Sequence, residues 1–116
     1  SAPMSTIHGI AQSGLEAAST RLDVSAHNVA NALTPGHAPL RVDAAEQPAG
    51  GVTTAVSRPP DPLAEARADA ALLAGSGTDL VAEVVAQSTA ARLFEANAAT
   101  LRTADVLFEA ALKLKP

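Results

Sequence analysis

Two features of this chain could in principle serve catalysis or ligand binding. They are its histidines, which can bind metals, and its glycine-rich turns, which can bind phosphate. The histidines are His8, His27 and His37, and no two of them have the spacing that places metal ligands on one helix face. Gly50-Gly51 and residues 75–77 do not follow a strand into a lysine-bearing phosphate loop, and no Gly-x-Ser-x-Gly elbow occurs. The chain has no cysteine, which excludes thiolate catalysis and disulfides. These patterns predict no enzyme, no metal, no cofactor and no small-molecule substrate.

The composition favours helices that need a packing partner. The 116 residues suffice for one domain, and 47% are hydrophobic, but Phe94 and Phe108 are the only aromatic residues and alanine dominates. Alanine is the best helix former, yet it buries little apolar surface. A net charge of −4, with lysine and arginine scattered, gives no footprint for nucleic acid. No apolar run reaches the roughly 20 residues that membrane insertion requires.

The N-terminal third predicts one long helix over residues 5–33. Pro35 and Gly36 stop it, because proline restricts the residue before it and glycine tolerates positive φ. Small and apolar residues recur at alternating steps of four and three, the spacing of a coiled-coil seam. This N-terminal seam comprises Ala11, Leu15, Ala18, Leu22, Ser25, Val29 and Ala32.

The middle of the chain is rich in proline and glycine, which forbids a long helix. Two segments, 40–43 and 52–56, predict strands of a small β-hairpin around a turn at 47–51. Strong helix formers at 63–74 predict a short helix, with an ordered coil as the alternative.

Residues 78–114 predict the second long helix. Ser76 followed by Asp79 resembles a capping box, and Thr78 is a second candidate cap. Its stripe again alternates four and three, and the C-terminal seam comprises Leu80, Val84, Gln87, Ala91, Phe94, Ala98, Leu101, Asp105, Phe108 and Leu112. The predicted fold is therefore mainly all-α, with two long terminal helices that form a hairpin or a coiled coil around a short middle region.

Four polar residues on or beside these seams have two interpretations each. Asp105 either sets register or meets a partner, as a charge on a seam does, or it is solvated at the helix edge. Asn28, Asn31 and Asn97 either hydrogen-bond across an interface or serve as helix-end caps and exposed side chains. The sequence leaves both pairs of alternatives open.

Both ends of the chain resemble a known family. Residues 13–37, which begin SGLEA and end RLDVSAHNVANALTPGH, closely resemble the N-terminal signature of flagellar axial proteins. Residues 78–105, with TDLVAEVV, ARLFEAN and TAD, look like the matching C-terminal signature. The proximal rod proteins are the most similar subgroup. His37 departs from the family pattern, which has Tyr or Phe there.

The resemblance implies a structural subunit of the basal-body rod or a rod-like tube in the bacterial flagellum, with a role in motility. Its partners would be copies of itself, other rod and hook proteins, and the flagellar type III export apparatus. Its location would be the periplasm-spanning basal body, reached without a cleaved signal peptide. The assembly contacts that it implies are Leu15, Leu22, Asn28, Val29 and Asn31 on the first helix, and Leu80, Val84, Phe94, Asn97, Leu101 and Asp105 on the second.

This organisation divides the chain into four parts. Residues 1–3 precede Met4 and are interpreted as left over from expression, 4–36 form the N-terminal signature helix, 37–77 the variable middle, and 78–116 the C-terminal signature helix. The short middle and His37 motivate an alternative function, a helical adaptor or regulator that derives from a rod protein but does not polymerise.

Overall fold

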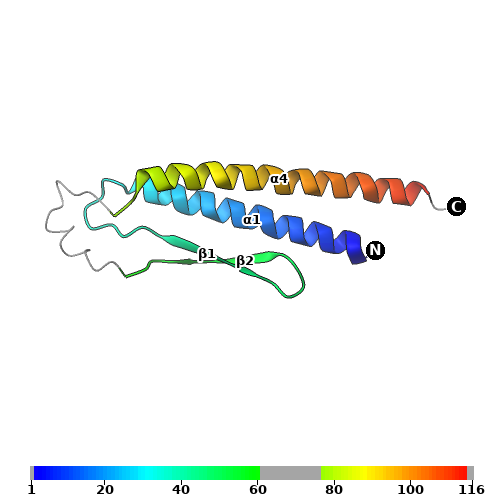
Figure 1. Ribbon diagram of the computed structural model, residues 1–116, viewed down its shortest axis with the longest axis horizontal. Coiled ribbons are helices and arrows are strands. Elements are labelled where there is room, and N and C mark those ends of the chain that lie inside the picture. The colour runs from blue at the N-terminus through cyan, green and yellow to red at the C-terminus, as the bar shows by residue number, and fades with distance from the viewer. Residues whose placement is uncertain (1, 61–76, 115–116) are drawn as a thin grey trace.

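The structure, a computed structural model, describes residues 2–60 and 77–114. Helix α1 spans Ala2–Ala30, strands β1 and β2 span Arg41–Glu46 and Val52–Ser57, and helix α4 spans Leu80–Lys113. The molecule is elongated, with extents of 74 × 24 × 14 Å, and α1 lies between α4 and the strands (Figure 1). The mainly helical fold is confirmed. The predicted short helix at 63–74 lies outside the described residues, and coiled-coil geometry stays a prediction.

Helix α1 ends at Ala30, three residues before the predicted end at residue 33. The backbone tightens there, because Ala32 N–H donates to Val29 C=O and Thr34 N–H donates to Asn31 C=O, which are bonds of three-residue turns. Gly36 then adopts a φ of 71°, as the predicted stop requires. At its other end, α1 begins at Ala2, before the predicted start at residue 5.

Helix α4 begins at Leu80, with Asp79 as its N-cap. The Asp79 carboxylate accepts a hydrogen bond from Ala82 N–H at 3.1 Å, which satisfies one of the free amides of the first turn. The first candidate cap, Ser76, lies outside the described residues. The second candidate, Thr78, donates its hydroxyl to the carbonyl of Asn28 at 3.2 Å. Thr78 therefore ties the start of α4 to the end of α1.

The predicted β-hairpin is present, and its strands are longer than expected. The two strands pair antiparallel from Arg41 opposite Ser57 to Glu46 opposite Val52. The first strand runs three residues past its predicted end at residue 43, since ladder pairing outweighs the weak strand preference of alanine. Gly50 and Gly51 close the turn at φ values of 98° and 89°.

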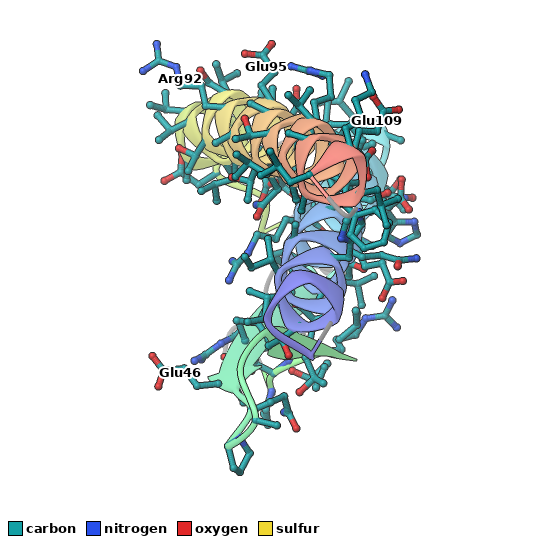
Figure 2. All side chains as sticks on the ribbon, turned by 90° about the vertical axis from the view of Figure 1, so that its right-hand side faces the viewer. Glu46, Arg92, Glu95 and Glu109 are labelled. Atoms are coloured by element: carbon teal, nitrogen blue, oxygen red, sulfur yellow. The ribbon has the colours of Figure 1, made fainter. Side chains whose placement is uncertain are left out.

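The hairpin is fastened to α1 near its turn. The hydroxyl of Ser13 accepts a hydrogen bond from Val52 N–H at 3.1 Å and donates to the Ile10 carbonyl at 2.7 Å. A Cβ at Gly50 would lie 2.8 Å from Ile10 Cδ1, and one at Gly51 would lie 2.7 Å from Ser13 Oγ. Viewed along the helices, α4, α1 and the strands follow one another in an arc (Figure 2).

Candidate assembly interface

The contact between α1 and α4 is built from small side chains. Ala11 and Ala18 of α1 and Ala90 and Ala104 of α4 are each at most 2% exposed, and they account for nearly all of the buried hydrophobic residues among those described. Small side chains allow helix axes to approach closely, but each contributes little hydrophobic free energy. The single subunit therefore buries little of its apolar surface.

The two helices pack tightly at Gly14 and Asn97. A Cβ built at Gly14 would be 2.5 Å from Asn97 Oδ1, so the amide group packs directly on the glycine backbone. Asn97 Nδ2 donates within its own helix, to the Leu93 carbonyl at 2.9 Å. The resemblance singled out Asn97, whereas Gly14 gave no signal of its own, because a lone glycine in a helical pattern shows only reduced helix propensity.

Asn28 is a buried polar junction, with only 1% of its surface exposed. Its Nδ2 donates to the Leu40 carbonyl at 3.0 Å and to Glu83 Oε1 at 3.2 Å, and its Oδ1 accepts Leu40 N–H at 2.8 Å. One turn earlier, the buried Ser25 hydroxyl donates to the Glu83 carbonyl at 3.2 Å. These bonds hold the end of α1, the chain entering β1 and the first turns of α4 together, so Asn28 has almost no surface left for a neighbouring subunit.

The other predicted contacts on α1 are more accessible. Leu22 and Val29 are exposed, and Leu15 is half-buried. Asn31 makes local bonds, since its Nδ2 donates to the His27 carbonyl at 3.0 Å and its Oδ1 accepts the hydroxyl of Thr34 at 3.1 Å. That arrangement matches the helix-end alternative for Asn31.

Asp105 pairs with His8 at the far end of the two helices, where Oδ1 lies 2.6 Å from His8 Nε2. Both side chains are substantially exposed, at 37% for His8 and 65% for Asp105, so the pair contributes little to stability. Together with the bond between Ser25 and Glu83, this contact shows that the two helices run antiparallel.

The predicted C-terminal seam is shifted on α4. The buried residues are Ala90 and Ala104, one position before the predicted Ala91 and Asp105, both of which are exposed. Of the predicted contacts, Asn97 and Leu101 are half-buried. Leu80, Val84 and Phe94 are exposed. The seam prediction placed the largest apolar side chains inward, whereas the helices meet through the positions that let them lie closest together.

The side of α4 opposite α1 carries large apolar side chains that the seam did not include. At its N-terminal end these are Val81 and Val85, next to Val84, and near its C-terminal end the helical period places Val106 on the same face. We call these four valines the outer face. Arg92 and Glu95 lie between the two apolar ends and point away from α1 (Figure 2). The sequence did carry a signal for this face, because apolar residues occur in adjacent pairs on α4. Neighbouring residues point in different directions from a helix, so one heptad stripe cannot include both.

Open grooves of about 470 Å³ and 290 Å³ lie beside α1, where Arg21 and Leu93 line both. Asn28 and Glu83 line the larger one and are already bonded to each other. Within residues 2–60 and 77–114, no three histidine or acidic side chains form a group that could hold a metal ion. None of the described helices is long and apolar enough to cross a membrane. The described geometry thus offers open surfaces beside the helices.

Comparison with known families gives two matches, one at each end of the chain. Residues 10–37 match the model described as flagella basal body rod protein. Residues 70–114 match the model described as flagellar basal body rod FlgEFG protein C-terminal. No curated protein matches the chain. The two matched segments contain α1 from Ile10 onward and all of α4, in the order expected for the family. The chain belongs to the flagellar basal-body rod protein family.

Proposed function

We propose that this protein is a structural subunit of the flagellar basal-body rod, or of a rod-like tube, and that it assembles through its terminal helices. Family membership supports a structural role in the basal body. The observation that carries the assembly step is the exposure of large apolar side chains on α4, while alanines fill the contact within the subunit. Among rod proteins, the proximal subgroup fits the short middle region best.

The energetics favour burial of these side chains between subunits. Val84 and Val106 are each 64% exposed, and complete burial of a valine side chain yields about 1.5 kcal/mol. A few such residues per contact give a weak interaction, because association also costs translational and rotational freedom. A tube solves this by giving every subunit several neighbours, so that weak contacts act together.

The proposed interface has two parts. On α1 it uses Leu15, Leu22 and Val29, and on α4 it uses Leu80, Val84, Phe94 and Leu101, together with Val81, Val85 and Val106 of the outer face. Asn28, Asn31, Asn97 and Asp105 contribute indirectly, because their contacts within the subunit hold α1 and α4 in the arrangement that presents these side chains.

Sedimentation velocity over a concentration series tests the proposal. Val84→Glu and Val106→Glu each place a charge in an apolar end of the outer face, and glutamate is a better helix former than valine. We expect both variants to shift self-association to higher concentration while circular dichroism shows unchanged helix content. Thr100→Glu is the matched control, since Thr100 is also β-branched and is exposed on the same helix, about 100° around it from the outer face. Self-association equal to wild type in both valine variants would contradict the proposed interface.

The alternative is an adaptor that binds rod proteins without polymerising, which the replacement of an aromatic residue by His37 favours. Incorporation into purified basal bodies distinguishes the two functions. A rod subunit enters the basal body in many copies, whereas an adaptor binds rod proteins in solution and is absent from the purified structure. If His37→Tyr also fails to enter basal bodies, the adaptor function is favoured.

We also propose delivery by the flagellar type III export apparatus, with other rod and hook proteins as neighbours in the basal body. This rests on family membership. Expression in a strain whose export gate is inactivated tests it. The protein should then accumulate in the cytoplasm, and its continued appearance outside the cytoplasm would contradict this route.

A further inference from the structure

His37 lies at a joint where several segments meet. Its backbone N–H donates to the Thr34 carbonyl at 3.2 Å, and its carbonyl accepts Gly77 N–H at 3.1 Å. Its ring lies 5.5 Å, centroid to centroid, from the ring of His27 on α1. The joint therefore connects the end of α1, the loop before β1 and the residues that lead into α4.

Among the described residues, the buried edge of the His37 ring has no polar partner. Nε2 is buried and accepts or donates no hydrogen bond within the described residues. A neutral imidazole tolerates this position with Nε2 unprotonated. Protonation would place a buried N–H donor there without an acceptor among the described residues, which is costly inside a protein.

The charged groups that act on His37 make protonation still less favourable. His27 lies on α1, and Arg58 follows β2, so both neighbours carry or can acquire positive charge. Burial, then His27, then Arg58 hold the pKa of His37 below its ordinary value of 6.5. The folded joint thus favours the neutral ring.

We propose that His37 is an acid-sensitive latch: its backbone carbonyl ties the residues before α4 to the loop after α1 while its ring is neutral, and protonation of the ring releases them. This goes beyond the proposed function and does not depend on it, because the latch acts within one subunit. The direction follows from linkage. Because the closed joint binds the proton more weakly than the open one, the latch contributes fully above pH 6.5 and weakens as the pH falls.

Hydrogen exchange by NMR tests the latch through two amides. Gly77 N–H donates to His37 itself, and Leu40 N–H donates to Asn28 Oδ1 a few residues along the loop. Between about pH 8 and about pH 5, we expect intrinsic-rate-corrected protection of Gly77 to fall by up to about tenfold per pH unit below 6.5. Leu40 should follow in the same direction, and the ring of His37 should titrate below 6.5.

His37→Phe keeps a ring and removes the titration, so protection of Gly77 should become independent of pH. His37→Gln serves the same purpose if the phenylalanine variant does not fold. His8→Gln is the matched control, and it should leave the pH dependence at Gly77 intact. Protection of Gly77 that does not change with pH in the wild type would overturn the proposal. So would an equal loss of protection in wild type and in the His37 variant.

Discussion

The tight contact between Gly14 and Asn97 predicts the effect of one substitution in detail. Gly14→Ala adds a single methyl group where a Cβ would lie 2.5 Å from Asn97 Oδ1 and 2.6 Å from Asn97 Cγ. Real Cβ atoms do not approach other atoms this closely, so the Asn97 side chain or the helix spacing must shift. Gly9 lies on the same helix, and nothing lies within 4 Å of the Cβ it would gain. Gly9→Ala is therefore a matched control.

Two opposing contributions decide how much each substitution changes the free energy of unfolding. Replacement of glycine by alanine inside a helix stabilises by about 1 kcal/mol, and both substitutions share this gain. Overpacking of a tight contact costs about 1–3 kcal/mol, and only Gly14→Ala incurs it. We therefore expect Gly9→Ala to stabilise by about 1 kcal/mol and Gly14→Ala to range from neutral to about 2 kcal/mol destabilising.

Thermal unfolding monitored by circular dichroism, at one dilute protein concentration, measures both effects. A change of 1 kcal/mol moves the Tm of a domain of this size by about 4 °C. The decisive variant is Gly14→Ala combined with Asn97→Ala. Removal of the Asn97 side chain makes room for the methyl group, so the double variant should regain about 1–3 kcal/mol relative to the sum of the single effects.

The reasoning fails if Gly14→Ala raises the Tm as much as Gly9→Ala does. It also fails if the effects of Gly14→Ala and Asn97→Ala simply add. Either result would mean that the helices do not approach each other at this point.

Two further predictions concern the polar contacts. Asn28→Ala removes three hydrogen bonds and leaves both Leu40 backbone groups without their partner, so chemical denaturation should show a loss of about 2–4 kcal/mol; Asn31→Ala, whose bonds are local, should cost less than about 1 kcal/mol. Equal losses in the two variants would contradict the junction. Ser13→Ala removes the bond to Val52 N–H, so exchange at that amide should accelerate while exchange within α4 stays unchanged. Faster exchange in both the hairpin and α4 would instead indicate that the substitution destabilises the whole subunit.

Much of the local structure could be predicted because its causes are local. Gly36, Gly50 and Gly51 stand where the backbone has positive φ, and all three fall at predicted stops or turns. Helix ends were less certain. Asp79 rather than Thr78 caps α4, because Thr78 is used in a contact with Asn28 that only the folded chain creates.

The buried residues of the candidate interface were likewise predicted only in part. The N-terminal seam was right at its small residues, since Ala11, Ala18 and Ser25 are buried. It was wrong at Leu22 and Val29, which are exposed. On α4 the periodicity of large residues was misleading, since Ala90 and Ala104 are buried instead. A stripe calculation ranks positions by hydrophobicity, but two helices meet where their side chains allow the closest approach. The outer-face valines therefore remained exposed and became visible as a surface only in the structure.

The sequence by itself determined two terminal helices, a proline- and glycine-rich middle with a β-hairpin, and membership of the rod family, because helix propensity, turn residues and family motifs are properties of short segments. Only the tertiary structure decided which face of α4 meets α1, that Asn28 joins three segments, and that His37 lies in a joint with its Nε2 unpartnered among the described residues. These features depend on contacts between residues far apart in the chain, and such contacts exist only once the helices have packed.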